Sequence, residues 1–593
     1  MKKKFLCFAL IASMVTSSFS ASAANSQKKN SAHNAFIVNP ITAYTEKNND
    51  FSLASAALLT DISTDITETN IKTVEEIAEE KAELLISYGI TSLEYAILDN
   101  GEMTLSSSAG YADVSKKKAP TDTTMYGIGS VSKMFTIAAV MQLVDEGKVD
   151  LDKPVVTYIP EFKMKDSRYK EITVRMLLNH SSGLMGSTFS NAMLLGTSST
   201  YTHDNFLKIL STEYLKYKPG NSSVYCNDGF FLAEILVEKI SGMTFTDYVE
   251  KKICNPLGLE HTKTPQSDFD KDMLAKTYYA SQNALPYESL NTIGAGGIYS
   301  TAEDLCIFGK MFMNNNDLLS NKAKKAMGSH EYLNGFWTTD TKNTTVAYGL
   351  GWDSVALPPY RNSGITAYNK GGDTIFHHAT MTVLPAYNIS IAALGSGGSS
   401  AIFELFTNLV LTEYLEQKNI FHAKETEEKT TYEITSLPKE AASYAGIYSS
   451  VFVDEMLVTV KDNAIHITIG AQTLIYYYTT AGVYIDSTQA SFIKFVDHNN
   501  TTYIECTESG TLQGFGSYTT TTFLGVKVSA NPLTPSVKAV WEKRNGKNYY
   551  KDKAVVTNYY MDKNKTVTLP DGGMILFIGN QNAKFTVTMK EIQ

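Results

Sequence analysis

Ser130 and Lys133 are the residues of this chain whose types and spacing point most directly to chemistry. They stand in the segment Met125-Tyr-Gly-Ile-Gly-Ser-Val-Ser-Lys-Met-Phe-Thr136, which leads into an apolar helical run. Residues three apart on a helix lie on one face. A serine hydroxyl needs a nearby base to become a nucleophile, and a lysine can serve once burial or neighbouring charge lowers its pKa. The pair predicts a nucleophilic serine at a helix start, where N–H groups and the helix dipole favour an oxyanion.

Two further elements follow in the sequence. The first is Tyr225-Cys-Asn227, in which the tyrosine can transfer a proton and the asparagine amide can bind a lysine, a tyrosine or a substrate carbonyl. The second is Lys370-Gly-Gly372, which opens a segment that ends in Met381-Thr-Val-Leu-Pro385. We interpret this segment as one strand with a lysine at its entry and glycines that let a substrate approach the backbone.

Ser-x-x-Lys, Tyr-x-Asn and Lys-x-Gly in this order resemble the serine β-lactamase and penicillin-binding-protein superfamily. The tyrosine of the middle element is similar to the class C-like branch, which also holds D-alanyl-D-alanine carboxypeptidases, D-aminopeptidases and family VIII esterases. Further segments typical of the family are Asn179-His-Ser-Ser-Gly-Leu184, Asn255-Pro-Leu-Gly-Leu-Glu-His-Thr262, Gly294-Ala-Gly-Gly-Ile-Tyr-Ser-Thr-Ala-Glu-Asp-Leu305 and Tyr348-Gly-Leu-Gly-Trp352. The resemblance covers about residues 75 to 420.

The resemblance implies a role for each matching position. Ser130 is the expected acylated nucleophile, and Lys133 is its activating partner. Tyr225 is the general base or acid, and Asn227 holds the acyl group or orders the site. Lys370 supports Tyr225 electrostatically or binds a substrate carboxylate. The resemblance further implies that the backbone N–H groups of Ser130 and Asp373 form the oxyanion hole and that Gly371 and Gly372 are substrate-binding positions.

The third element departs from the family pattern. Its middle residue is usually threonine or serine, whose hydroxyl helps to bind a carboxylate, and here it is Gly371. We therefore expect acyl-enzyme chemistry more firmly than efficient β-lactam turnover. The neighbouring His377 and His378 could suggest a metal, but adjacent strand residues point to opposite faces. No Cys/His cluster with zinc spacing occurs in the sequence, so we expect neither a metal nor a cofactor.

Composition and the first residues bear on partners and localisation. A formal net charge of −9, without a basic patch, argues against nucleic-acid binding. Met1-Lys-Lys-Lys4, an apolar run from Phe5 to Val15 and Ala21-Ser-Ala23 form the pattern of a secretory signal with cleavage near Ala23. The apolar run is too short to span a bilayer. We expect a secreted, extracytoplasmic protein without an integral membrane span, acting on a small-molecule or peptide substrate, with cell-wall peptidoglycan as a candidate polymer.

The chain of 593 residues is too long for one domain. We predict a signal peptide over 1–23, a flexible N-terminal segment over 24–72, a catalytic domain over 73–422 and C-terminal β domains over 432–593. Hydrophobic spacing predicts a first helix over Val74 to Ser87 and a hairpin around Asp99-Asn-Gly101. The fold class is α+β: an antiparallel sheet beside a helical cluster, followed by an all-β, barrel-like domain. Leu437-Pro438 to Ala445-Gly-Ile-Tyr448 resembles the entry of lipocalin-like domains.

The sequence thus favours a secreted serine hydrolase that acts through a Ser130 acyl-enzyme on D-amino-acid-containing peptides or β-lactams. Two alternatives stay open at this point. One is an esterase of the same fold. The other is a non-hydrolytic penicillin-binding or sensing protein, which would form a slow acyl adduct.

Overall fold

The computed structural model describes residues 72–544, except 189–191, 279–283, 334–337, 339–343, 423–431, 450–455, 471, 490, 499–500 and 529–533, together with four short strands beyond residue 544. The predicted signal peptide, nearly all of the predicted N-terminal segment and the charged stretch Lys424–Thr431 lie outside these residues. Among the described residues, no helix is long and apolar enough to cross a membrane.

A five-stranded antiparallel sheet organises the first part of the chain, with strand order β2-β1-β11-β10-β9. Its strands are β1 (Ser92–Asp99), β2 (Glu102–Gly110), β9 (Tyr368–Asp373), β10 (His377–Leu384) and β11 (Ile389–Ser396). Successive side chains on a strand point to opposite faces. Leu93, Tyr95 and Ile97 of β1 accordingly join one core cluster, whereas Ala96 and Leu98 join the other. Both faces of the sheet are therefore covered.

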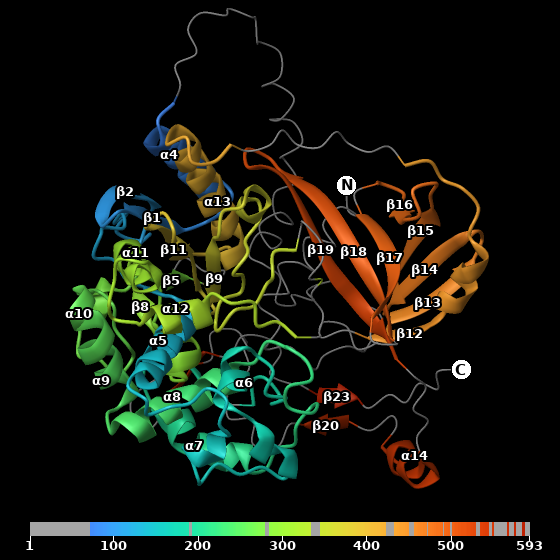
Figure 1. Cartoon of the computed structure of the whole chain (residues 1–593), viewed down its shortest axis with the longest axis horizontal. Helices are drawn as coiled ribbons and strands as arrows, with labels where there is room; N and C mark the ends of the chain where they lie inside the picture. Colours follow the sequence, from blue (N-terminus) through green and yellow to red (C-terminus); the bar gives the residue numbers. More distant parts are fainter. Residues whose placement is uncertain are drawn as a thin grey trace, which may run out of the picture.

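Two helices cover the first face. These are α4 (Val74–Ser87) and α13 (Ser400–Gln417), which lie side by side (Figure 1). Helix α4 begins where the sequence predicts it, because Thr73 and Glu76 form a reciprocal capping box that satisfies two backbone N–H groups of the first turn. Ala78, Ala82 and Leu85 recur at helical spacing and are its buried face.

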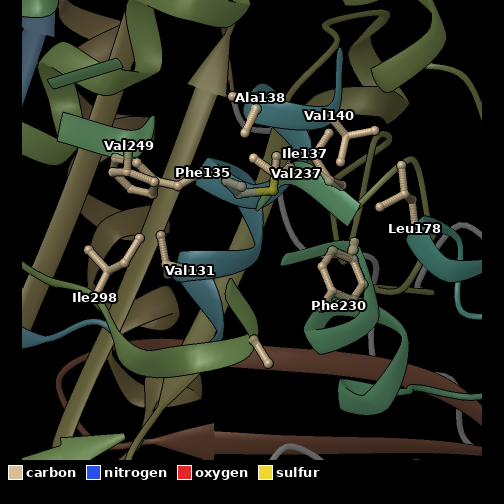
Figure 2. Packing of buried hydrophobic residues seen from close by; sticks show 14 of the residues in the cluster. Val131, Phe135, Ile137, Ala138, Val140, Leu178, Phe230, Val237, Val249 and Ile298 are labelled. Atoms are coloured by element: carbon tan, nitrogen blue, oxygen red, sulfur yellow. The ribbon is translucent and has the colours of Figure 1, made fainter. Parts of the chain in front are cut away.

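A helical cluster covers the second face and holds the larger core. It contains α5 (Ser132–Asp145), α6 (Val174–Leu178), α7 (Tyr201–Leu210), α8 (Asn227–Ser241), α9 (Phe245–Val249), α10 (Asn255–Leu257), α11 (Ala302–Gly309) and α12 (Asn321–Met327). Helix α5 is buried on all sides: Phe135, Ile137, Ala138 and Val140 contact side chains from several neighbouring elements (Figure 2). A helix that is apolar all round belongs in the centre of a domain. The first turn of α5 is consequently held in place by the whole core.

The structure corrects two local expectations near the proposed site. Ser130 does not open the long helix but lies in a 3₁₀ turn, Gly129–Val131, and α5 begins at Ser132. The segment from Lys370 to Pro385 is not one strand, because residues 374–376 turn the chain between β9 and β10. The buried Glu288 accepts hydrogen bonds from the N–H groups of Ile375 and Phe376, and these bonds stabilise a turn that strand periodicity alone does not reveal.

A closed eight-stranded antiparallel barrel forms the second large unit, as the sequence predicts, and lies beside the first (Figure 1). Its strands are β12 (Gly446–Ser449), β13 (Met456–Lys461), β14 (Ala464–Ile469), β15 (Gln472–Tyr478), β16 (Tyr484–Asp486), β17 (Ser491–His498), β18 (Thr501–Leu512) and β19 (Gly516–Lys527). Beyond the barrel, the region expected to be all β contains a helix, α14 (Pro535–Glu542). The strand β22 (Met574–Leu576) pairs with β4 (Met193–Leu195) of the first unit.

Candidate active site

The candidate active site lies where the turn before α5, the start of α8 and the end of β9 meet. The backbones of β9 and this turn lie so close together that glycine is required at Gly129 and at Gly372. A Cβ at Gly372 would lie 2.1 Å from the Ile128 carbonyl oxygen, and a Cβ at Gly129 would lie 2.4 Å from the Asp373 nitrogen. Only glycine permits such an approach. The result is that the backbone nitrogens of Ser130 and Asp373, the two predicted oxyanion donors, lie close together.

Lys133 is fully buried, and all of its polar contacts serve the predicted chemistry. Its Nζ lies 3.0 Å from Ser130 Oγ, 2.7 Å from Asn227 Oδ1 and 2.6 Å from the Ala295 carbonyl oxygen. Burial lowers the pKa of Lys133 well below its usual value, and the nearby charge of Lys370 lowers it further. A neutral amine has two N–H groups and one lone pair. The two N–H groups can donate to Asn227 and Ala295, which leaves the lone pair for the Ser130 hydroxyl.

Tyr225 connects Ser130 to Lys370. Its Oη lies 3.4 Å from Lys370 Nζ, and the Ser130 side chain is close enough to lower the pKa of Tyr225 against the larger effect of burial. Burial raises the pKa of Tyr225 well above its usual value, and the carboxylate of Asp353 acts in the same direction. Tyr225 is therefore a protonated phenol at neutral pH. This arrangement is consistent with Lys133 as the base and Tyr225 as the acid, one of the two roles that the sequence leaves open for the tyrosine.

The structure thus brings together all of the site residues that the sequence singles out. Asn227, at the start of α8, also donates from Nδ2 to Ser187 Oγ at 3.0 Å. Gly371 and Gly372 lie side by side on β9, next to Lys370. His180, which belongs to a segment typical of the family, stacks on Tyr225 with ring centroids 4.4 Å apart and accepts a hydrogen bond from the Cys226 N–H. It orients the tyrosine and has no contact with Ser130 among those described.

The adjacent histidines of β10 point away from each other, as strand geometry requires. His377 Nδ1 accepts a hydrogen bond from the Gly127 N–H at 3.0 Å, whereas His378 Nδ1 lies 2.7 Å from Asp373 Oδ1. Asp373 also accepts hydrogen bonds from the backbone and side chain of Ser400. These donors hold the pKa of the Asp373 carboxyl below its usual value against the opposing effect of burial. The Asp373 carboxylate is thus fully engaged away from Ser130.

Sequence reasoning misses three residues that complete the site. Asp353 Oδ2 lies 2.8 Å from Lys370 Nζ. Ala295 contributes the carbonyl that accepts from Lys133, within the π-helical turn η7 (Ile293–Gly297). Glu234 of α8 is buried and accepts the Gly294 N–H at 2.7 Å, which fixes that turn. For Asp353 and Ala295 a signal exists, because Asp353 directly follows the family-like Tyr348-Gly-Leu-Gly-Trp352 segment and Ala295 lies within the family-like segment that begins at Gly294. The contact of Glu234 depends on packing alone.

Comparison with solved structures supports the fold. SurE aligns with a TM-score of 0.53 at 19% identity, over 72% of this chain and 95% of that chain, and has also been solved with D-Leu. The octameric penicillin-binding protein homologue from Pyrococcus abyssi aligns with a TM-score of 0.50 at 20% identity, over 74% of this chain and 96% of that chain.

Comparison of sequences identifies the family. Protein flp of Staphylococcus aureus (strain COL) is 25% identical over 53% of this chain and 61% of that protein. The putative penicillin-binding protein PbpX of Bacillus subtilis (strain 168) is 26% identical over 47% of this chain and 68% of that protein. The chain thus spans less than two thirds of the length of flp. The Beta-lactamase family model matches residues 71–405, which is more than half of the chain and includes every site residue named above. Together with the arrangement around Ser130, this match places the chain in the beta-lactamase family, whose members are typically serine hydrolases.

Proposed function

We propose that this protein is a secreted serine hydrolase that acts through an acyl-enzyme at Ser130 on D-amino-acid-containing peptides. The observation that carries the proposal is the 3.0 Å contact between Ser130 Oγ and the buried Lys133 Nζ. The other two contacts of that amine are acceptors, so its lone pair is directed to the serine when the amine is neutral. A neutral lysine beside a hydroxyl is the arrangement that nucleophilic catalysis needs.

The proposed reaction follows from these positions. Lys133 Nζ takes the proton of Ser130 Oγ while the oxygen attacks the substrate carbonyl carbon. The oxyanion accepts hydrogen bonds from the N–H groups of Ser130 and Asp373. Tyr225 gives its proton to the leaving nitrogen as the C–N bond breaks, and the proton that Lys133 took from Ser130 then passes to the tyrosine oxygen, which leaves Lys133 neutral again. Lys133 then takes a proton from the water molecule that attacks the ester carbonyl carbon. This proton passes to Ser130 Oγ as the acid product leaves.

Two observations support D-amino-acid-containing peptides as the substrate class. One is what the relatives are named for or have been solved with, and the other is the missing hydroxyl side chain at Gly371. PbpX is named as a putative penicillin-binding protein, and SurE has been solved with D-Leu. The hydroxyl that the family pattern places at position 371 is absent here, which disfavours substrates that bind there through a free carboxylate, β-lactams among them. β-Lactam hydrolysis stays the second candidate, because the matching family model is that of beta-lactamases. Secretion is supported by the basic and apolar start of the chain and the small residues before position 24.

The test is the intact mass of the protein over time with a D-alanyl peptide and, separately, with a penicillin. We expect the peptide to be cleaved and Ser130→Ala to abolish both cleavage and any adduct. A persistent penicillin adduct together with peptide cleavage would indicate a penicillin-binding peptidase with slow deacylation, whereas a persistent adduct without peptide cleavage would indicate the non-hydrolytic binding protein. A transient adduct with consumption of the drug would indicate a β-lactamase, and cleavage of simple esters alone would indicate an esterase. Hydrolysis that survives in Ser130→Ala contradicts the proposal.

A further inference from the structure

Lys370 is the cation that a substrate group would meet beside Tyr225, but its ammonium is already fully used. An ammonium has three N–H groups. Those of Lys370 have three acceptors within reach: Asp353 Oδ2 at 2.8 Å, the Gly371 carbonyl oxygen at 2.6 Å and Tyr225 Oη at 3.4 Å. The Lys370 side chain is only 1% exposed. A substrate carboxylate could bind this ammonium only by displacing one of these acceptors.

The exposed member of this ion pair is the acid. The Asp353 side chain is 25% exposed, and its Oδ2 also accepts the Gly371 N–H at 3.0 Å. Since Tyr225 is the proposed proton donor to the leaving nitrogen, a substituent next to that nitrogen comes close to Lys370 and Asp353. Such a substituent meets a carboxylate rather than an ammonium. An anionic substituent and the Asp353 carboxylate both carry negative charge, and like charges repel each other strongly in a partly buried site.

The surroundings of Gly371 strengthen this arrangement. A Cβ at Gly371 would lie 3.2 Å from Ser400 Oγ, which is tighter than usual, and 3.8 Å from Asp353 Oδ2, an ordinary contact, so the glycine makes room chiefly for Ser400. The Ser400 hydroxyl is not available to a substrate carboxylate, because it donates to Asp373 Oδ2 at 2.7 Å. Glu404, one turn along α13, adds a second acid. Burial and the Asp353 charge raise its pKa to about 7 against the effect of Lys370.

We propose that Asp353 is a specificity-determining residue that occupies the position where an anionic substrate group would meet Lys370. This inference rests on the proposed function and narrows its substrate class. The preferred substrates are peptides in which the residue after the scissile bond carries an amide, an ester or a further peptide bond. Peptides in which that residue ends in a free carboxylate, and penicillins, which carry one, are disfavoured.

The test compares two peptides that share one scissile bond, N-acetyl-D-alanyl-D-alanine and its C-terminal amide. We expect the kcat/KM of the wild-type protein for the amide to exceed that for the free acid by roughly tenfold or more, because the acid carries one negative charge that Asp353 repels. D353N should reduce this ratio by about the same factor, chiefly through faster cleavage of the acid. D247N, which removes an exposed acid paired with Lys251 far along the sequence, is the matched control and should leave the ratio unchanged. An equal loss of both activities in D353N would mean that Asp353 is merely structural.

A second measurement separates this inference from the proposed function. The dissociation constants of the acid and the amide are measured by calorimetry on Ser130→Ala, with and without D353N, so that no chemistry is needed. The amide should bind more tightly than the acid, and D353N should remove the difference. Equal binding, tighter binding of the acid, or no binding of either peptide overturns the role of Asp353. Absence of Ser130-dependent hydrolysis, by contrast, overturns only the proposed function.

Discussion

At the scale of single residues, the chemistry depends on keeping Lys133 uncharged. Its amine is buried between Asn227 Oδ1 and the Ala295 carbonyl, two neutral acceptors that satisfy N–H groups without stabilising a positive charge as a carboxylate would. Burial is the main reason that the pKa of Lys133 is lowered. The asparagine of the Tyr-x-Asn element is thus a neutral hydrogen-bond partner whose lack of charge matters as much as its geometry.

Asn227→Asp tests this point, because it keeps the shape and adds a charge. If the new carboxylate is ionised, it stabilises the ammonium and raises the pKa of Lys133. The base then stays protonated up to a higher pH, so the acid limb of the pH profile of kcat/KM should move upward by about one unit or more. Asn227→Ala, which adds no charge, should lower the rate without this shift. An unchanged acid limb in Asn227→Asp would exclude Lys133 as the base.

At the scale of elements, the turn η7 delivers the Ala295 carbonyl to Lys133 and is itself held by two neighbouring helices. Thr136 of α5 donates to the Gly294 carbonyl oxygen at 2.7 Å, and Glu234 of α8 accepts the Gly294 N–H. A Cβ at Gly294 would lie 2.7 Å from Thr136 Oγ1, so the glycine allows this close packing. The Lys133 amine is therefore positioned by three elements that are distant in sequence.

Glu234 makes this element sensitive to pH. Burial raises its pKa from 4.5 to about 8, against the opposing charge of His203. In this window the folded state binds more protons than the unfolded state, so the free energy of unfolding falls as pH rises from 4.5 towards 8. We expect Glu234→Gln, whose side-chain carbonyl can still accept the Gly294 N–H, to make this decline shallower by a few kcal/mol. The measurement is the free energy of unfolding of both proteins from urea titrations at about pH 5.5 and about pH 7.5.

The difference between Glu234→Gln and the wild type isolates the contribution of Glu234 to the pH dependence of the free energy of unfolding. His203 has a pKa raised to about 9, mainly by its hydrogen bond with Glu238, so its own contribution to stability is also lost as pH rises from 6.5 to 9. This contribution is present in both proteins and largely cancels in the difference. An identical slope of the free energy of unfolding with pH in both proteins would contradict the raised pKa of Glu234.

At the scale of the whole molecule, the tip of the β18–β19 hairpin joins the barrel to the sheet-and-helix unit (Figure 1). Tyr88, at the end of α4, donates from its Oη to the Gln513 carbonyl oxygen at 2.9 Å. Phe515 packs against the core cluster shared by α4 and α13. Gly514 lies against Leu84 with a φ of +81°, a left-handed conformation that favours glycine. Thr338 Oγ1 also donates to the Thr521 carbonyl oxygen at 3.4 Å.

Phe515→Ala tests whether this junction couples the two units. The loss of a partly buried ring should cost about 1–3 kcal/mol at the interface and lower the thermal midpoint of the sheet-and-helix unit. Scanning calorimetry should then separate one transition into two. Phe492→Ala, which removes a barrel ring whose centroid lies 6.0 Å from that of Tyr432 in a tilted arrangement, is the matched control and should affect only the barrel transition. An unchanged profile in Phe515→Ala would mean that the units are stable independently of this contact.

Local patterns in the sequence determine the parts of this protein that depend on neighbours along the chain. Helix α4, the hairpin around Asn100, the antiparallel character of the sheet and the Ser130–Lys133 pair all follow from periodicity, capping or spacing, which act over a few residues. Only the tertiary structure decides what surrounds these groups. The pairing of Asp353 with Lys370, the support of η7 by Glu234 and the turn after β9 all join residues from separate elements. Burial both lowers the pKa of Lys133 and raises the pKa of Tyr225, and burial is a property of the packed molecule.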